Sequence, residues 1–233
     1  NGWRAPLAND IDQWTIWKAG LTRTPGMGNG PSNAWFAHGL DKMTTTLDHY
    51  EWLVKDGNLV LVIENHSCNP GKTTCFDNHF VYTFSGNGKM DIDHTVTPQG
   101  KMPEWLPRVG VQLVLDTTLQ LLEWYGRGPF ETYPDRKTGA KTGDWSIPVN
   151  DQYVPYLIPQ ENGNHTDVRW MTLLNSAGSG IRISASELFQ FSALPVESDN
   201  LSRALYPFQL ETFNGITLNL DYALSGVGCT AIS

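Results

Sequence analysis

The stretch Glu51–Glu64, EWLVKDGNLVLVIE, contains two apolar runs separated by a turn signal. The dipeptide Asp56-Gly57 favours the tight turn of a β-hairpin, because glycine adopts positive φ without steric cost. The residues on either side have the apolar pattern of strands. The stretch therefore predicts a hairpin that sets Trp52 and Val54 opposite Leu59 and Leu61.

The two-residue alternation typical of strands recurs along most of the chain, and turn-forming residues separate the runs. We expect strands over Asn58–Glu64, His79–Phe84, Lys89–Val96, Val109–Leu115, Leu119–Tyr125, Arg169–Leu174, Ile181–Ala185 and Ile216–Tyr222. Two stretches predict helices, one near Asp12–Ala19 and one at Asp199–Leu205, where Ser198 or Asp199 caps the first turn. Many antiparallel strands with few helices indicate an all-β fold, a large β-sandwich.

Length and charge exclude several classes of protein. The 233 residues fit one large β domain or two small ones, and a chain of this length needs no disulfide or metal to fold; we expect a single domain over residues 1–233. The formal net charge is −8 and the basic residues are scattered, which excludes a nucleic-acid partner. The longest apolar run, Leu59–Ile63, is too short to span a membrane. The chain begins at Asn1 and stops at Ser233 where another strand could start, so we expect a fragment of a longer multidomain polypeptide.

The three cysteines leave the redox state open. Cys68 and Cys75 flank a turn-forming sequence that brings them within bridging distance, and two reduced thiols are the equal alternative. Cys229 has no evident partner, and no Cys-x-x-Cys or paired His spacing predicts a metal site. The acidic, aromatic-rich composition and the candidate bridge favour the bacterial periplasm over the cytoplasm.

Aromatic residues, prolines and glycines concentrate between Trp124 and Trp170, among acids and arginines. Prolines do not suit a helix interior or a central strand. We therefore expect a long irregular loop system that forms a functional surface, together with excursions at Gly20–Asn33 and Thr97–Arg108. Aromatic faces cover the C–H groups of a pyranose while carboxylates and amides bind its hydroxyls, so the loops predict a cleft for a neutral sugar.

A set of ordered motifs spans almost the whole chain. They are Trp3-Arg4-Ala5-Pro6 with Asn9-Asp10, Leu106-Pro107-Arg108-Val109-Gly110, Trp124-Tyr125-Gly126-Arg127-Gly128-Pro129, Tyr133-Pro134-Asp135-Arg136, Tyr153-Val154-Pro155-Tyr156, Pro159-Gln160-Glu161-Asn162-Gly163-Asn164, Val168-Arg169-Trp170, Phe191-Ser192-Ala193-Leu194, Leu218-Asn219-Leu220-Asp221 and Gly226-Val227-Gly228. In this order they resemble the C-terminal small-chain domain of glycoside hydrolase family 2 β-galactosidases. The sequence departs from the family at Ala8, Asp12 and Tyr206, and no Trp follows the late Gly-x-Gly before the chain stops.

The resemblance implies a galactose-mutarotase-like β-supersandwich beside a separate catalytic (β/α)8 barrel. Retaining glycosidases use a nucleophile and an acid/base that are roughly 5–5.5 Å apart, and both glutamates belong to the barrel. The chain is then expected to line the carbohydrate cleft, to hold no catalytic residue and to be inactive by itself. The resemblance also implies a homo-oligomeric parent that uses Mg²⁺ or Na⁺, with no cofactor in this chain. The departures concern which β-linked sugar the parent accepts.

The candidates for sugar contact or for lining the cleft are Arg4, Asn9, Asp10, Glu131, Tyr133, Asp135, Arg136, Glu161, Asn162 and His165. The structural alternative for the carboxylates in the loops is a set of bidentate bridges to Arg127, Arg136 and Arg169. For Asn9-Asp10 the alternative is a turn or cap, and for His165 an isolated surface histidine.

Neighbouring aromatic residues and glycines have structural expectations. Trp124, Trp145 and Trp170 are expected in the core or at an interface. Gly126, Gly128 and Gly163 are expected to have unusual backbone dihedrals.

Two other functions stay open. An autonomous aldose mutarotase needs a base for the anomeric O–H and an acid for the ring oxygen, and Glu161 with His165 is the nearest such pair. A non-catalytic carbohydrate-binding or structural module needs neither group.

Overall fold

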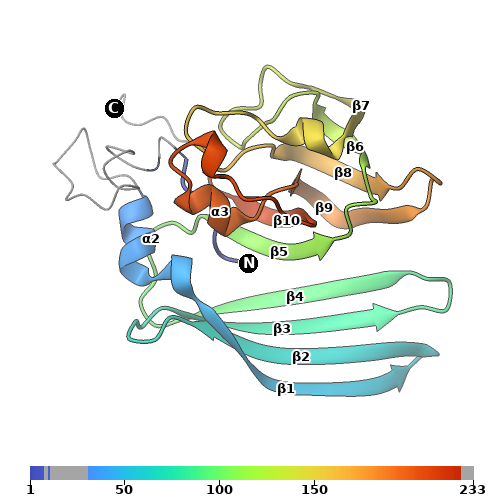
Figure 1. Cartoon of the computed structure of the whole chain (residues 1–233). Coiled ribbons are helices and arrows are strands. Elements are labelled where there is room, and N and C mark those ends of the chain that lie inside the picture. Colours follow the sequence, from blue (N-terminus) through green and yellow to red (C-terminus); the bar gives the residue numbers. More distant parts are fainter. Residues whose placement is uncertain (8–9, 11–30, 227–233) are drawn as a thin grey trace. The chain divides into compact units, whose positions relative to one another are not determined.

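A computed structural model of the chain describes residues 1–7, 10 and 31–226 (Figure 1). The chain divides into two compact units, residues 1–33 with 106–233 and residues 34–105. Regular structure in the described residues is mostly antiparallel β, with two short α-helices, which confirms the expected all-β class. The mutarotase-like arrangement and the extent of a single domain over 1–233 stay predictions.

The unit of residues 34–105 contains a four-stranded antiparallel sheet in the order β1-β2-β3-β4. The strands are β1 (Thr44–Lys55), β2 (Asn58–Cys68), β3 (Cys75–Phe84) and β4 (Met90–Gln99). The predicted hairpin is confirmed in register, because Trp52 lies opposite Leu61 and Val54 opposite Leu59. Asp56 and Gly57 both have positive φ, as the tight hairpin turn requires.

Helix α2 (Ser32–His38) and the short 3-10 helix η2 (Leu40–Lys42) precede β1 and were not expected. A seven-residue helix is too short for periodicity to reveal it. Trp35 is fully buried and its Nε1 donates to Trp105 O at 2.9 Å, so a tertiary contact stabilises the helix. The helix expected near Asp12–Ala19 lies outside the described residues.

Cys68 and Cys75 form a disulfide at one end of the β2–β3 pair. The two residues are register partners in that pair, and their Cα atoms are 4.5 Å apart. The antiparallel register therefore decides between the two alternatives that the spacing left open. Cys229 lies outside the described residues.

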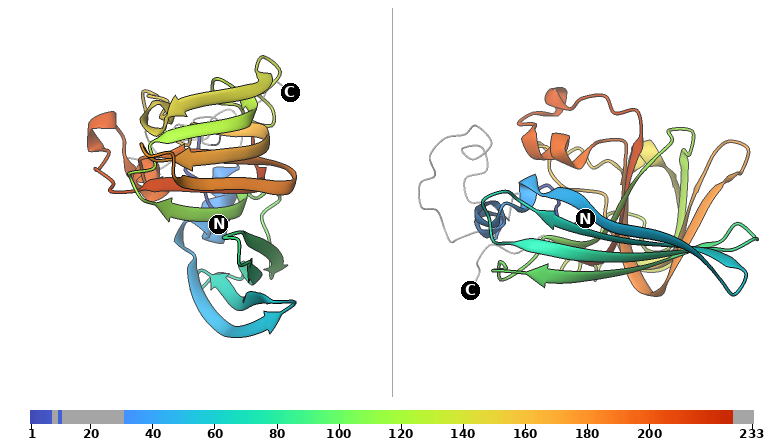
Figure 2. Two further views of the ribbon diagram at one scale, coloured as in Figure 1. Left: turned by 90° about the vertical axis from the view of Figure 1, so that its right-hand side faces the viewer. Right: turned by 90° about the horizontal axis from the view of Figure 1, so that it is seen from below.

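The other unit contains a six-stranded antiparallel sheet in the order β5-β10-β9-β8-β6-β7. Its strands are β5 (Arg108–Leu115), β6 (Leu121–Gly128), β7 (Lys141–Pro148), β8 (His165–Leu174), β9 (Gly180–Leu194) and β10 (Ile216–Leu224). The connections carry the 3-10 helices η3 (Val149–Gln152) and η4 (Pro207–Gln209) and the helix α3 (Ser198–Arg203) (Figure 2). Helix α3 confirms the second predicted helix, but Glu197 occupies its N-cap and no side chain caps it.

Alternate residues of the six-stranded sheet form the core of this unit. Leu122 lies opposite Leu173, and Trp124 opposite Met171, and all four are fully buried. Phe191 joins the same cluster from β9. Successive side chains of a strand point to opposite faces of the sheet, so burial of one face explains the two-residue alternation of apolar residues in the sequence.

The expectation of one irregular loop from Trp124 to Trp170 is wrong in part. Strand β6 continues to Gly128, β7 occupies Lys141–Pro148 and β8 begins at His165. Strand β7 is an edge strand of its sheet, where the proline at its last residue costs no inner ladder bond. Apart from η3, two irregular connections remain, residues 129–140 and 153–164.

Candidate functional site

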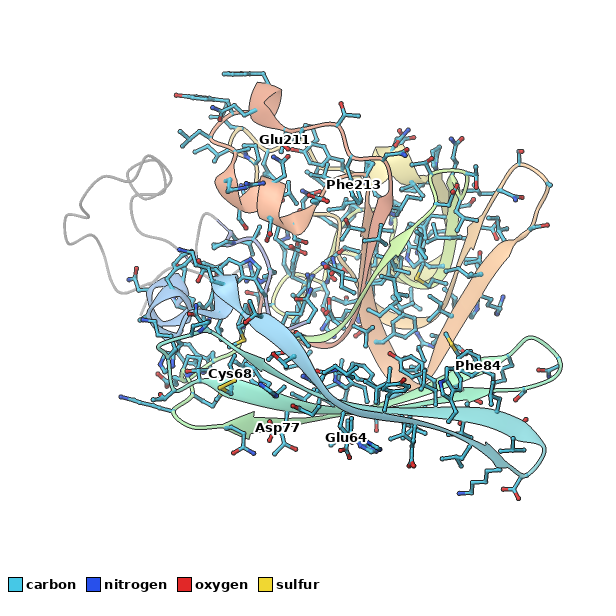
Figure 3. All side chains as sticks on the ribbon, turned by 60° about the horizontal axis from the view of Figure 1, so that its bottom comes forward. Glu64, Cys68, Asp77, Phe84, Glu211 and Phe213 are labelled. Carbon is cyan, nitrogen blue, oxygen red and sulfur yellow. A yellow bond between two sulfur atoms is a disulfide. The ribbon has the colours of Figure 1, made fainter. Side chains whose placement is uncertain are left out.

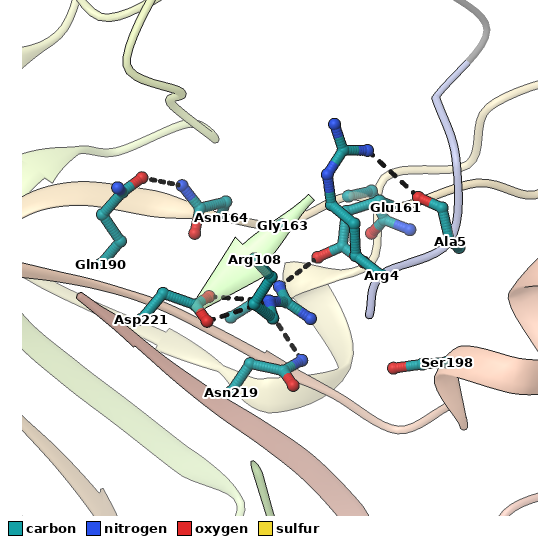
Figure 4. Close-up of polar contacts among 12 residues, drawn as sticks. Arg4, Ala5, Arg108, Glu161, Gly163, Asn164, Gln190, Ser198, Asn219 and Asp221 are labelled. Atoms are coloured by element: carbon teal, nitrogen blue, oxygen red, sulfur yellow. Dashed lines mark hydrogen bonds and ion pairs between the residues drawn. The ribbon is translucent and has the colours of Figure 1, made fainter. Parts of the chain in front are cut away.

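A buried ion cluster forms where β5 begins and β10 nears its end. It consists of Arg108, Glu161 and Asp221, and we call it the Arg108 cluster (Figure 4). Arg108 Nη2 donates to Glu161 Oε1 at 2.8 Å. Arg108 Nε lies 2.9 Å from Asp221 Oδ1 and 3.0 Å from Oδ2, and its N–H is aligned on Oδ2. The three side chains are 0–2% exposed, so each charge depends on the others.

Burial has opposite effects on the acids and the base of this cluster. Burial raises the pKa of Asp221 to about 7, although the Arg108 guanidinium opposes that shift. Burial alone would lower the pKa of Arg108, but the two carboxylates raise it. Arg108 is therefore cationic at all relevant pH, and Asp221 carries the titration near neutrality.

A second buried pair, Arg4 with Asp10, ties the start of the chain to the end of β10. Arg4 Nη1 donates to Asp10 Oδ2 at 2.8 Å, and Nη2 donates to Ser225 Oγ at 2.7 Å and to Gly226 O. Asp10 Oδ2 also accepts the Leu7 N–H at 2.7 Å. Burial raises the pKa of Asp10 in spite of Arg4. The structural alternative for Asp10 is the one that the geometry favours.

A third cluster joins the two irregular connections, 129–140 and 153–164. Glu131 Oε1 accepts hydrogen bonds from Arg136 Nη2 and Tyr156 OH, and Oε2 accepts the Gly163 N–H at 2.8 Å. We call these four residues the Glu131 cluster. Glu131 is buried, whereas the Arg136 side chain is 48% exposed. The buried carboxylate of Glu131 thus connects both loops, and the guanidinium of Arg136 stays partly exposed at the surface.

Tyr133 lies beside this cluster and is fully buried. Burial, together with the charges of Glu131 and Glu161, raises its pKa well above 10. Its hydroxyl and Arg108 Nη1 have no hydrogen-bond partner among the described residues. Arg136 stands over the Tyr133 ring, 5.5 Å from its centroid.

The loop arginines do form bridges, but mostly with partners other than those expected. Arg136 pairs with Glu131 as predicted. Arg127 pairs instead with Asp167, which Lys137 also contacts, and Glu161 takes its bridge from Arg108. Burial alone would raise the pKa of Asp167, but hydrogen bonds from Arg127 and Lys137 lower it. Arg169 lies over the Tyr125 ring at 5.0 Å.

His165 is not a surface histidine, so that alternative is wrong. Its ring is 1% exposed and packs against Trp124 and Phe191. Nε2 lies 2.9 Å from Gln152 Oε1. Burial lowers the pKa of His165 to about 3. The ring is therefore neutral, enclosed and a poor proton donor near neutral pH.

Three candidates remain. Asn162 is buried and braces its own loop, accepting the Val154 N–H at 3.0 Å and donating to Gln160 O at 2.9 Å. Asp135 is exposed, and its carboxylate lies so near Gly226 that a Cβ there would come within 2.3 Å. Asn9 lies outside the described residues. The structure thus joins Arg4 to Asp10 and Glu131 to Arg136, and gives Glu161 and His165 separate buried partners.

Two members of the buried clusters, Arg108 and Asp221, were not among the candidates. Both occur in the ordered motifs. The available signal was a polar residue inside an otherwise apolar strand: Asp221 follows Leu218 and Leu220 on β10 yet is 1% exposed. A buried charge at such a position requires a partner, which sequence spacing does not reveal across 113 residues.

Aromatic and glycine positions mostly follow structural expectations. Trp124 and Trp145 belong to the core, while Trp170 stacks under Arg182 at 4.2 Å. Gly163 has φ +71° as expected. Gly126 and Gly128 do not have positive φ, and a Cβ at either would meet a neighbouring side chain within 3.0 Å, so close packing is the constraint there.

The described residues contain neither a membrane-spanning helix nor a metal-binding cluster. No helix there is long and apolar enough to cross a membrane. No group of three or more His, Cys, Asp or Glu residues within 1–7, 10 and 31–226 has an arrangement that holds a metal ion.

The sequence as a whole matches one protein family. The profile described as "Beta galactosidase small chain" covers residues 1–233, so the chain belongs to the β-galactosidase small-chain family. The all-β fold agrees with this membership.

Individual relatives are proteins named β-galactosidase. The chain is 38% identical over 150 residues to one from Priestia megaterium, an alignment that covers 64% of this chain and 14% of the relative. It is 36% identical over 152 residues to Beta-galactosidase BgaC from Bifidobacterium adolescentis, covering 64% and 14%. It is 28% identical over 232 residues to one from Oenococcus oeni, covering 97% and 21%. The chain thus spans about a fifth or less of the length of these relatives.

Proposed function

We propose that this chain is the C-terminal, non-catalytic portion of a retaining β-galactosidase-like glycoside hydrolase. In this proposal it lines the carbohydrate cleft beside a separate catalytic barrel of the same polypeptide. The observation that supports it most is the match of residues 1–233 to the family, whose members named above are nearly five times as long as this chain.

The chemistry of the buried carboxylates supports placing catalysis elsewhere. A retaining glycosidase needs one carboxylate that can attack the anomeric carbon and one carboxylic acid that can protonate the leaving oxygen. Glu131, Glu161 and Asp221 are all buried and engaged with arginines. A buried carboxylate whose oxygens are engaged by a guanidinium is a poor nucleophile, so these three hold the structure rather than react.

The exposed candidates are the ones we assign to sugar contact. Arg136 and Asp135 are exposed on the connection 129–140. Hydrogen bonds of the Glu131 cluster fix this connection, and they restrict the position of the Arg136 guanidinium. In the proposed cleft, Arg136 or Asp135 contacts a hydroxyl group of the sugar.

The mutarotase alternative has little support in this geometry. Its base, Glu161, is engaged by Arg108, and its acid, His165, is enclosed by Trp124 and Phe191. A carbohydrate-binding module without catalysis stays a prediction, and calorimetric titration of galactose into the isolated chain tests it.

Several properties of the parent belong to the same proposal. The disulfide favours an oxidising compartment such as the periplasm. A homo-oligomeric parent and its use of Mg²⁺ or Na⁺ follow from the resemblance alone. Removal of metal with a chelator from the longer polypeptide, followed by a hydrolysis assay, tests the metal.

The test of the proposed function is hydrolysis by the longer natural polypeptide that contains these residues. We expect it to cleave a chromogenic β-galactoside with retention of anomeric configuration. Arg136→Ala should raise KM, and Lys141→Ala, an exposed residue of β7, serves as the control. Inertness of the longer polypeptide toward every β-glycoside would reject the proposal.

A further inference from the structure

Strand β1 has four exposed apolar side chains between Leu47 and Val54. Leu47, Tyr50, Trp52 and Val54 are 55%, 58%, 53% and 76% exposed. Isolated exposed apolar residues are ordinary on protein surfaces, but four in a row on one strand are not. Unlike scattered surface residues, they form one stripe between Leu47 and Val54 within the twelve-residue strand.

The four side chains share a face because of a β-bulge. The register shifts between Leu47 and His49, so that Leu47 lies opposite Asn65 and Tyr50 opposite Ile63. Since Asn65 and Ile63 are two residues apart on β2, Leu47 and Tyr50 point to the same side, despite the three-residue spacing. Without the bulge, Leu47 would point to the opposite face from Tyr50.

The opposite side of this sheet is the polar one. Glu64 and Asp77 project from it (Figure 3), and Glu51, which lies next to Tyr50 in β1, alternates onto it as well. Acidic and histidine side chains pair across it, as in the contact of His66 with Asp48 at 2.7 Å. Solvent therefore suits that side, whereas the Leu47–Val54 stripe is apolar without such partners.

The outer backbone edge of β1 also has no strand partner among the described residues. Strand β1 pairs with β2 alone, and it stands at the end of the sheet order. Natural proteins cover, shorten or charge such edges, because free N–H and C=O groups recruit other strands. This strand is twelve residues long and contains no proline, although its bulge and its charged residues Asp48, Glu51 and Lys55 are among the features that limit such pairing.

We propose that β1 is a docking edge for a β-strand from the part of the parent polypeptide outside these 233 residues. The added strand pairs with the outer edge of β1, and its alternate apolar side chains extend the stripe formed by Leu47, Tyr50, Trp52 and Val54. The inference rests on the proposed function only in treating the chain as part of a longer polypeptide.

Two observations favour this occupant. The free backbone edge is recognised by main-chain hydrogen bonds, which a strand supplies and a helix does not. The relatives extend far beyond the matched region, since this chain covers 14–21% of their length, so each such polypeptide has ample additional chain to supply a strand. A second copy of this chain is the competing occupant, and the test distinguishes it.

Hydrogen exchange measured by mass spectrometry provides the first readout. Peptides that contain β1 are compared between the 233-residue chain and the longer natural polypeptide. We expect the exchange of β1 amides to slow by roughly tenfold or more in the longer polypeptide. Peptides from β2, which is paired on both sides, serve as the internal reference and should change much less.

A pair of substitutions on one strand provides the second readout. Val54→Lys places a charge on the stripe, and Glu51→Lys places one on the other side of β1. In the isolated chain both should shift Tm little, because both sites are exposed. In the longer polypeptide Val54→Lys should lower Tm by at least about 4 °C more than Glu51→Lys does.

The outcomes separate the alternatives. Equal exchange of β1 in the two proteins, or equal effects of Val54→Lys in both, overturns the proposal. A dimer of the isolated chain by light scattering that Val54→Lys dissociates assigns the stripe to a second copy and also overturns it. Because neither readout uses hydrolysis, protection of β1 in a polypeptide without glycosidase activity would reject the proposed function and leave this inference standing.

Discussion

Asp221 is a charged residue that lies in the protein interior. It is almost fully buried on β10, and the guanidinium of Arg108 is its only ion-pair partner among the described residues. Breaking a buried pair from one side costs several kcal/mol, since the remaining charge stays desolvated. The chain therefore depends on Arg108 more strongly than on any exposed candidate.

The titration of Asp221 predicts how stability depends on pH. Its pKa is raised from 3.8 to about 7 in the folded state, so between these values the folded protein holds a proton that the unfolded chain has released. The contribution of Asp221 to the free energy of unfolding should therefore fall as the pH rises through this window, by up to about 1.4 kcal/mol per pH unit. Urea denaturation between about pH 5 and about pH 7 measures it.

The matched variant for this prediction is Asp221→Asn, which keeps the shape and removes the titration. His165 and His94, whose folded pKa values are lowered to about 3 and about 4, make stability rise with pH below about 6.5 in both proteins, so the comparison isolates Asp221. The unfolding free energy of the wild type minus that of Asp221→Asn should fall as the pH rises from about 5 to about 7. Asp167, whose pKa is lowered, acts in the opposite sense at more acidic pH and leaves this window unaffected. Parallel pH profiles for the wild type and Asp221→Asn would contradict the assignment.

At the residue level the motifs located the right region but not the pairing. Arg4 and Glu161 were identified from their positions in the motifs, and Glu131 as a carboxylate of the stretch between Trp124 and Trp170; all three are buried in ion pairs. The partner of Glu161 could not be predicted, because Arg108 is 53 residues away and the fold alone brings them together. The burial of His165 was missed for the same reason. The rings of Trp124 and Phe191 cover it in the fold, but both residues are distant from it in the sequence.

Among the elements, the connection 153–164 depends on a glycine for two separate reasons. Gly163 has φ +71°, and a Cβ there would lie 2.9 Å from Gln152 O. Gly178 has φ +75° with nothing within 4 Å of such a Cβ. Comparing alanine substitutions at the two glycines therefore distinguishes the cost of the left-handed backbone from the cost of crowding.

We predict that Gly178→Ala costs about 1 kcal/mol, from the left-handed conformation alone. Gly163→Ala should cost at least about 1 kcal/mol more, because the new methyl group also displaces the loop whose N–H bonds Glu131. Denaturant titrations of both variants give the two values. Equal losses would show that the crowding at Gly163 is relieved without cost.

The disulfide between β2 and β3 closes a short loop and should contribute modestly. A sequence separation of 7 predicts about 2 kcal/mol from the restricted unfolded chain. The double variant Cys68→Ser/Cys75→Ser should lose about that amount. Reducing agent should destabilise the wild type equally and leave the double variant unchanged, and an effect on both would point to another thiol.

Strands were predictable as elements because their pattern is local. The Asp56-Gly57 turn and the alternation around it determine the β1–β2 register, which the structure confirms. Strand β7 was hidden because two of its residues, Gly143 and Pro148, are typical of loops, although an edge strand tolerates them. Helix α2 was hidden because its stability comes from the buried Trp35 contact rather than from periodicity.

For the whole molecule, family membership and all-β class are established, and the division of labour with the rest of the polypeptide is proposed. The ordered motifs indicated the family, which the profile match confirms, and the absence of a nucleic-acid partner, inferred from the net charge of −8, stays a prediction. Neither the motifs nor the fold of this chain reveals what lies beyond it in the parent. The loops and buried clusters described here are suited to support a surface, with their carboxylates already engaged.

The most direct test of this account is a hydrolysis assay of the purified 233-residue chain alone with a chromogenic β-galactoside. The account predicts release of the chromophore at the rate of the buffer blank, because the buried carboxylates Glu131, Glu161 and Asp221 are all engaged by arginines. Turnover by the isolated chain that Glu131→Gln or Glu161→Gln abolishes, with the fold intact by circular dichroism, would contradict it.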